Sequence, residues 1–250
     1  MFIDSHCHIH DTHFFSDSRE AVYQRAVAAK VKMVLVGTSE ADSRAAIEFA
    51  ATHNDTYAVV GVHPHDARDG WQDIDRILSE KSDVLIGVGE IGLDYFYDNS
   101  PRGVQIQALE QQLQWAHDYK LPVSFHVREA FDDFWPIFDN FSSISGVLHS
   151  FTDTEATLER ALERGLYIGV NGISTFTKDM AQCDMFNHIP LNRMLLETDA
   201  PFLTPKPFRG KMNEPAFVKL VAEHHAIQRG CDIAVIAQAT TANARALFAL

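Results

Sequence analysis

The sequence alternates between short apolar runs and longer segments with helical periodicity, and this alternation limits the fold more than any other feature. The runs predicted to be strands are 2–6, 32–37, 57–62, 84–89, 122–126, 146–149, 166–170 and 193–197. The segments predicted to be helices are 18–30, 41–53, 71–81, 104–119, 130–141, 154–164, 177–188 and 214–229. Runs such as VLIGV are apolar almost throughout, as parallel strands covered on both faces require. The pattern therefore predicts an α/β fold built from βα units of about 30 residues.

Eight βα units predict a closed (β/α)8 barrel, known as the TIM barrel. The 250 residues are expected to form one such domain, 1–250, with an extra helix over about 232–248 outside the barrel. The competing fold is a doubly wound open sheet, which shows the same alternation. A glycine-rich phosphate loop after the first strand would favour that sheet, and this chain has HCHIH there instead.

The composition is that of an ordinary globular protein, with 46% hydrophobic and 22% charged residues. No stretch approaches the roughly 18 apolar residues of a membrane span, and the N-terminus lacks the pattern of a signal peptide. Three cysteines without a CxxC pair indicate free thiols in a reducing compartment. The sequence predicts a cytoplasmic protein without membrane association, and no obligate protein partner is evident.

The net charge of −13 argues against tight, salt-resistant binding of nucleic acid, which needs many contacts from Lys and Arg to phosphates. It leaves open an enzyme that binds phosphodiesters weakly and locally. The irregular segment 200–215 carries Lys206, Arg209 and Lys211 after the last predicted strand. Loops after the seventh and eighth strands of TIM barrels often bind phosphate, so this basic loop favours an anionic substrate.

Residues of the types that bind metal ions stand at the ends of several predicted strands: His6, His8, Glu90, His126, His149 and Asp199. The carboxyl ends of barrel strands meet at one rim, so we expect these side chains to converge there. A mixed set of nitrogen and oxygen ligands suits Zn²⁺, Mn²⁺, Co²⁺ or Fe²⁺, with Mg²⁺ possible if waters complete the coordination. The sequence predicts bound divalent metal cations without choosing among these elements.

Further candidates are predicted to bind substrate at the same rim. His63 ends the third predicted strand and is a candidate to hydrogen-bond phosphate, with a structural role as the alternative. Arg128 follows His126 by two residues, and its guanidinium is expected to clamp a phosphate unless it pairs with an acidic neighbour, Glu129 or Asp132.

Asp94 and Tyr95 follow Glu90 and are candidates to contact substrate or to orient the metal ligands. Arg209 and Asn213 are candidates in the basic loop. The alternative for Asn213, together with Glu214, is to cap a helix that begins near Pro215.

Seven motifs appear in order along the chain: HCH (6–8), GVHP (61–64), GEIGLDY (89–95), PVSFHVRE (122–129), LHSF (148–151), LLETDAP (195–201) and RGKMNEP (209–215). Together they resemble the TatD family of metal-dependent deoxyribonucleases, which belongs to the amidohydrolase-like barrels. The resemblance covers about residues 1–248. It implies a TIM barrel of the metal-dependent hydrolase type that binds two divalent cations (Mg, Mn or Zn). It also implies that His6, His8, Glu90 and Asp199 hold one ion, while Glu90, His126 and His149 hold the other.

The resemblance further implies a 3′–5′ exonuclease that cleaves the phosphodiester bonds of DNA. Two cations that share Glu90 are expected to activate a water, and Asp199 is expected to take its proton. The main alternative is a small-molecule amidohydrolase that acts on a cyclic amide, a lactone or a similar compound. Arg128 and the basic loop count against that alternative. A non-enzymatic metal-binding protein would not explain an aspartate placed to act as a base.

Overall fold

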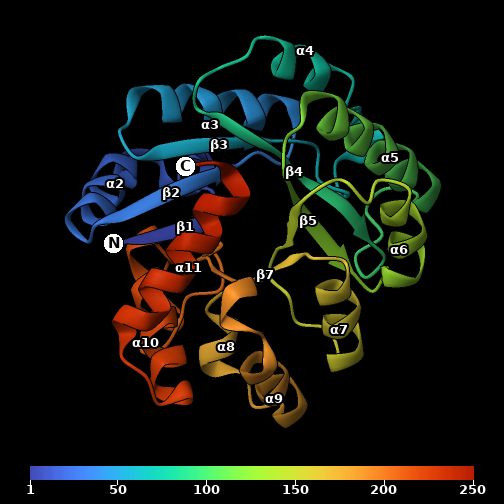
Figure 1. Cartoon of the computed structure of the whole chain (residues 1–250). Coiled ribbons are helices and arrows are strands. Elements are labelled where there is room, and N and C mark those ends of the chain that lie inside the picture. The colour runs from blue at the N-terminus through green and yellow to red at the C-terminus, as the bar shows by residue number, and fades with distance from the viewer. The chain divides into compact units, whose positions relative to one another are not determined.

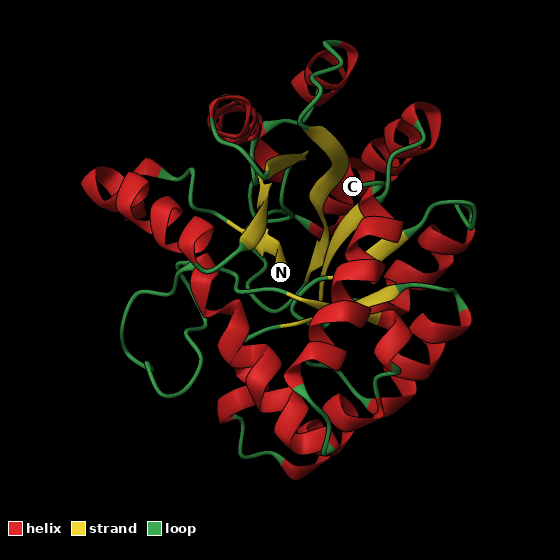
Figure 2. Cartoon of the chain, turned by 60° about the vertical axis from the view of Figure 1, so that its left-hand side comes forward, coloured by secondary structure: helices red, strands yellow, loops and turns green.

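The computed structural model describes all 250 residues, as alternating strands and helices (Figure 1). The strands follow one another in the sheet in chain order, from β1 to β8. The chain divides into two compact units, Met1–Leu35 with Ser150–Leu250 as the first and Val36–His149 as the second. Every predicted strand and helix has a counterpart. Figure 2 distinguishes the helices from the strands by colour. The expectation of one domain stays a prediction.

The first unit contains four parallel strands: β1 (Phe2–Cys7), β2 (Val31–Val36), β7 (Tyr167–Val170) and β8 (Met194–Leu196). β1 pairs with β2 and β7 pairs with β8, while a bridge from Cys7 to Ala200 joins β1 to the residues after β8. The helices of this unit are α1 (Thr12–Phe15), η1 (Ser16–Ser18), α2 (Arg19–Ala28), α7 (Glu155–Glu163), α8 (Ile173–Phe176), α9 (Met180–His188), η3 (Leu191–Arg193), η4 (Pro215–Phe217), α10 (Val218–Arg229) and α11 (Ile233–Phe248). The helix predicted over about 232–248 is thus present, and it packs against β1, β8 and α10.

The second unit contains β3 (Thr56–Val60), β4 (Leu85–Asp94), β5 (Val123–Arg128) and β6 (Gly146–Leu148), again all parallel. Its helices are α3 (Glu40–Thr52), η2 (Ala67–Asp69), α4 (Asp73–Ser79), α5 (Arg102–Tyr119) and α6 (Phe131–Asp139). Helix α6 presents Phe134 and Phe138 to Phe125 of β5, with ring centroids 5.2 and 5.6 Å apart. This aromatic cluster is buried and fixes the position of the strand that carries His126.

Strand β4 is longer than predicted. It continues to Asp94, so Glu90 lies inside the strand instead of at its end. Glycine makes this possible, because a Cβ on Gly92, whose φ is +155°, would lie 1.7 Å from the carbonyl oxygen of His126. A Cβ on Gly89 would likewise collide with Ser124. These glycines let β4 and β5 approach each other closely, which places Glu90 and His126 on neighbouring strands.

Several helix ends carry the caps that their sequences favour. The hydroxyl of Ser39 accepts from the amide of Asp42 at the start of α3, and the carboxylate of Asp232 accepts from Ala234 at the start of α11. The short helices α1 and α8 escaped the sequence analysis, because four residues are too few to show a period. No helix combines the length and the apolar character needed to cross a membrane.

Candidate metal centre

The first unit brings two histidines and one aspartate together. His6 and His8 are two residues apart at the end of β1, so both rings project to the same side. Their Nε2 atoms lie 3.2 Å apart. Oδ1 of Asp199 lies 3.4 Å from Nε2 of His8 and 3.9 Å from Nε2 of His6. These three residues are the predicted metal ligands that lie in the first unit.

The spacing of these atoms fits a divalent cation. Ligand atoms about 2.0–2.2 Å from a tetrahedral Zn²⁺ lie roughly 3.3–3.5 Å from each other. The separations of 3.2 and 3.4 Å around His8 Nε2 are close to those values. Two neutral imidazole nitrogens can share only one proton between them, whereas a cation can accept a lone pair from each. The donor set therefore suits a metal ion.

Asp199 is held by a buried network on β1. Its backbone amide donates to the carbonyl oxygen of His6 at 2.9 Å. The neighbouring Thr198 donates its backbone amide to Asp4 at 2.8 Å and its hydroxyl to the other oxygen of the same carboxyl. Burial raises the pKa of Asp4 to about 8. Asp199 itself has a φ of +58°, a conformation that few residues other than glycine adopt, so its surroundings hold it in a strained position.

The loop after β8 also holds the residues around Asp199 in place. Asn213 is fully buried, and its amide nitrogen donates to the carbonyl oxygens of Thr198 at 2.8 Å and Phe202 at 2.6 Å. A side chain in this position holds the loop in place, and its contact with substrate stays a prediction. Glu214 does not cap a helix with its side chain, since its carboxylate pairs with Arg25 at 2.6 Å.

Arg209 is also tied to its own loop. Its guanidinium donates to the carbonyl oxygen of Thr204 at 3.0 Å and lies 3.8 Å from the ring centroid of Phe176. The side chains of Lys206 and Lys211 are exposed in the same loop. The loop is therefore basic at its surface, as predicted, although the contact of Arg209 with substrate stays a prediction.

The second unit gathers histidines around one carboxylate oxygen. Oε1 of Glu90 lies 2.9 Å from Nδ1 of His126, 3.7 Å from Nε2 of His63 and 3.8 Å from Nε2 of His149. Glu90 is buried, and so are His63 and His149. Ligand atoms of His63, Glu90 and His126 all lie within 4.8 Å of one another, which is a spacing that a metal ion can fill. This cluster contains the remaining three predicted metal ligands.

Asp94 fixes the orientation of His126. The two ring nitrogens of His126 contact different carboxylates, Nδ1 facing Glu90 and Nε2 facing Asp94 at 2.9 Å. Burial tends to lower the pKa of His126, but the hydrogen bonds to Asp94 and Glu90 outweigh it and raise that pKa. A cation beside Glu90 would take the place of the Nδ1 proton, while the Nε2 proton stays in the hydrogen bond to Asp94. Carboxylates commonly orient metal-binding histidines in this way.

Asp94 is itself fully buried, so its position supports the role of orienting the metal ligands over direct contact with substrate. It also accepts from Nε2 of His65 at 3.0 Å and from the backbone amides of Phe96 and Tyr97. Burial would raise the pKa of Asp94, but the hydrogen bonds from His126 and His65 outweigh it and hold that pKa well below its usual range. The carboxylate is therefore a stable negative charge behind His126.

His63 is oriented as a hydrogen-bond donor. The backbone amide of His65 donates to its Nδ1 at 3.1 Å, so the neutral ring carries its proton on Nε2, the atom that faces Glu90. Burial lowers the pKa of His63 well below its usual value, which keeps the ring neutral. This arrangement agrees with the predicted role of His63 toward phosphate better than with direct ligation of a metal ion.

Tyr95 directly follows β4, and Arg128 is the last residue of β5. The side chain of Tyr95 is hydrogen-bonded, whereas that of Arg128 is not. The hydroxyl of Tyr95 donates to Asp133 of α6 at 2.7 Å, and Arg102 lies 4.1 Å from its ring centroid. Arg128 is exposed and stacks 3.9 Å from the ring centroid of Phe96, without an ion pair to either acidic neighbour that the sequence analysis considered. Both contacts with substrate stay predictions.

The sequence analysis missed two residues that shape the second cluster. His65 shares Asp94 with His126, and the spacing His63-Pro64-His65 repeats that of His6 and His8, which was a usable signal. Gln105 of α5 exchanges hydrogen bonds with the backbone of Asp94 at 2.8 and 3.0 Å. Nothing in the sequence marked this glutamine, since a buried polar residue on a helix looks like a surface residue until its neighbours are known.

Comparison with known proteins identifies the family. Residues 3–249 match the family model described as TatD related DNase. The chain is 34% identical to an uncharacterised metal-dependent hydrolase, YabD, of Bacillus subtilis, with 99% of each chain covered. It is 35% identical to the 3′-5′ ssDNA/RNA exonuclease TatD of Salmonella typhimurium, with 94% of each chain covered.

A solved structure confirms the fold class. The crystal structure of YJJV, a TatD homologue from Escherichia coli K12, matches with a TM-score of 0.93 and 31% sequence identity, covering 100% of this chain and 98% of that one. The predicted (β/α)8 barrel is therefore confirmed, and so is the resemblance on which the sequence analysis relied. The chain belongs to the family of TatD-related DNases and is a metal-dependent hydrolase.

Proposed function

We propose that this protein is a divalent-metal-dependent deoxyribonuclease that removes nucleotides from the 3′ end of single-stranded DNA. The observation that carries the proposal is the cluster at Glu90, where one buried carboxylate oxygen faces ring nitrogens of His126, His63 and His149. The relatives named as 3′-5′ ssDNA/RNA exonucleases, at 35–36% identity, support the choice of substrate.

Two divalent cations are part of the proposal. The spacing of His6, His8 and Asp199 supports one, and the Glu90 cluster, with His126 and His149, supports the other. That both ions share Glu90 is inferred from the family resemblance. We expect Mg²⁺, Mn²⁺ or Zn²⁺, since the donor set mixes imidazole with carboxylate. Bound cations of this kind supply Lewis-acid stabilisation of charge on phosphate oxygens and make water more acidic.

The side chains of this protein are proposed to do the remaining work. Asp199 accepts the proton of the attacking water, and its strained backbone holds the carboxylate in place. Asp94 keeps the Nε2 proton of His126, so the ring does not turn away from Glu90. His63 donates its Nε2 proton to a phosphate oxygen or to an ordered water. Arg128, which has no ion-pair partner, pairs with a phosphate of the DNA strand.

The proposed function is tested with protein loaded with each metal and an oligonucleotide labelled at its 5′ end. Progressive shortening from the 3′ end is expected, and Asp199→Asn is expected to slow it about 10²- to 10⁴-fold, the usual contribution of a general base. A panel of cyclic amides and lactones runs in parallel. Turnover of that panel with DNA left intact would replace the proposal with the amidohydrolase alternative.

Metal analysis tests the role of Glu90 separately from activity. Glu90→Gln is expected to lower the content of both cations, because it removes the charge that two ions are proposed to share. Loss of one cation alone would restrict Glu90 to a single ion. An unchanged content of both would remove Glu90 from the set of metal ligands.

A further inference from the structure

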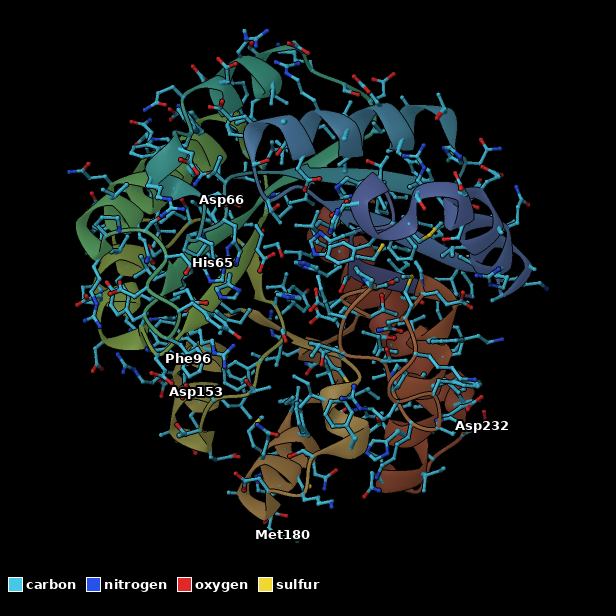
Figure 3. The ribbon with its side chains drawn as sticks, turned by 180° about the vertical axis from the view of Figure 1, so that it is seen from behind. His65, Asp66, Phe96, Asp153, Met180 and Asp232 are labelled. Carbon is cyan, nitrogen blue, oxygen red and sulfur yellow. The ribbon has the colours of Figure 1, made fainter.

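Two aromatic side chains project from the loop that follows β4. Phe96 is 49% exposed and Tyr97 is 54% exposed, and their ring centroids lie 4.8 Å apart in an edge-to-face arrangement. Figure 3 labels Phe96 and His65, which both belong to the second unit. Aromatic rings of this size are normally buried, so two exposed neighbours need an explanation. Neither ring has a part in the proposed metal centre.

Arg128 gives this aromatic pair a positive charge. Its guanidinium carbon lies 3.9 Å from the ring centroid of Phe96 and 4.9 Å from that of Tyr97. The guanidinium makes no hydrogen bond or ion pair within the protein, and the residue is exposed. Stacking on the rings therefore holds its plane in a fixed orientation while its donors remain open to an anion. In a chain with a net charge of −13, Arg128 therefore places a positive charge beside these exposed rings.

The aromatic pair is anchored on the same carboxylate as a predicted metal ligand. The backbone amides of Phe96 and Tyr97 donate to Oδ1 of Asp94 at 3.0 and 2.9 Å. The other oxygen of Asp94 accepts from His126 at 2.9 Å. In addition, the ring of Tyr97 lies 5.2 Å from that of His65, which donates to the same oxygen. The backbone that carries the rings is therefore fixed relative to the Glu90 cluster by hydrogen bonds within one unit.

We propose that Phe96, Tyr97 and Arg128 form a stacking platform for an unpaired base of a single-stranded nucleic acid, and that Arg128 also pairs with a flanking phosphate. This inference rests on the proposed function and names how that site selects its substrate. An unpaired base can lay its face on an exposed ring anywhere along a strand, whereas a duplex offers an open base face only at its terminal pair. Every base has such a face, so the platform selects single strands with little regard to sequence.

Binding of phosphorothioate oligonucleotides, which are cleaved slowly, tests the platform by fluorescence anisotropy with the metal-loaded protein. The strands are a normal single strand, the same strand with abasic sites, and a blunt duplex. The normal strand is expected to bind about tenfold more tightly than the abasic strand, as stacking of a base on a ring contributes. The double variant Phe96→Leu with Tyr97→Leu is expected to lose this difference and to bind both strands as the wild type binds the abasic one.

Three further variants keep the test interpretable. Phe96→Trp retains a stacking surface and is expected to keep the preference for bases, which a merely structural role of the ring would not require. Met180→Ala removes an apolar side chain of α9 that is 71% exposed and labelled in Figure 3, and it is expected to change nothing. Arg128→Gln is expected to lower the slope of log affinity against log salt concentration by the amount that about one phosphate contact contributes. The leucine variant is not expected to change this slope.

The outcomes separate this inference from the proposed function. If the wild type shortens DNA but shows no preference for bases, or if the leucine variant keeps that preference, the platform is wrong and the deoxyribonuclease stands. If the wild type shows the preference and the leucine variant loses it while no DNA is cleaved, the platform stands and the proposed function fails. If no strand binds, both are overturned.

Discussion

The buried groups around Asp94 in the second unit and the buried Asp4 and His225 in the first respond to burial in opposite ways. In the second unit, Asp94 and His126 lie in contact, and each shifts the pKa of the other toward the charged form. In the first unit, burial raises the pKa of Asp4 to about 8 and lowers that of His225 to about 3, so burial favours the neutral form of both groups. Asp4 bonds to Thr198 and His225 contacts Ser174, and neither hydrogen bonds to a side chain of opposite charge.

The difference shows that burial alone does not decide whether a side chain is charged. Desolvation disfavours the charged form of every group, and only a nearby opposite charge or several donors can reverse it. Asp94 has four such donors, two from imidazole rings and two from backbone amides. The surroundings of Asp94 therefore keep a charge where a metal ligand has to be oriented, whereas those of Asp4 and His225 favour neutral hydrogen bonds.

The largest effect is expected from separating the strands that bring the charged pair together. In Gly92→Ala the new Cβ would meet the carbonyl oxygen of His126 at 1.7 Å, so β4 and β5 must move apart. We expect a loss of more than about 4 kcal/mol in the free energy of unfolding, measured by urea denaturation. Gly103→Ala in α5 is the control, because nothing lies within 4 Å of its new Cβ and a helix tolerates alanine well. Equal stability of the two variants would contradict the close approach.

The next effect compares the two buried aspartates directly. Asp94→Asn removes the charge that fixes His126, and we expect metal affinity and kcat to fall about 10- to 100-fold. Asp4→Asn replaces a carboxyl whose pKa burial raises to about 8 with a neutral group of the same shape, so we expect less than about a threefold change in either quantity. Metal titration and initial rates measure both. Similar losses in the two variants would mean that charge is not what distinguishes these sites.

A smaller effect concerns the pH dependence of stability. His225 has a folded pKa of about 3, below the value near 6.5 of an unfolded histidine. Between these values the unfolded chain binds a proton that the folded chain excludes, so stability falls as the pH decreases from about 6.5 toward 3. One proton corresponds to about 1.4 kcal/mol for each pH unit. In His225→Gln this part of the slope should disappear from urea denaturation curves recorded across the range. Parallel curves for the two proteins would show that His225 does not titrate as described.

The smallest effect is expected in the basic loop of the first unit. Lys206→Ala combined with Arg209→Ala removes two positive charges and should raise KM for DNA a few-fold while flattening its dependence on salt. Because Arg209 also holds Thr204 and stacks on Phe176, Lys206→Ala alone serves as the control that leaves the loop intact. Unchanged KM and salt dependence would leave substrate binding to other parts of the chain.

Much of the fold was predictable because strands and helices leave periodic patterns. The predicted helix at 232–248 is α11, and the irregular segment after the last strand is present as expected. The end of β4 was not predictable, since GEIGLDY contains two glycines and two carboxylates that usually interrupt a strand. The strand continues because those glycines fit against β5, a contact that the sequence does not reveal.

The sequence by itself determined which residues are candidates for metal binding, because ligand types after apolar runs and the family motifs are local features of the chain. Only the tertiary structure decided what surrounds them: that Asp94 stands behind His126, that Asn213 is buried in its loop, and that Arg128 stacks on Phe96. These relations depend on which groups from distant segments come within hydrogen-bonding or stacking distance. Burial and partners, which set charge and orientation, exist only after the chain has folded.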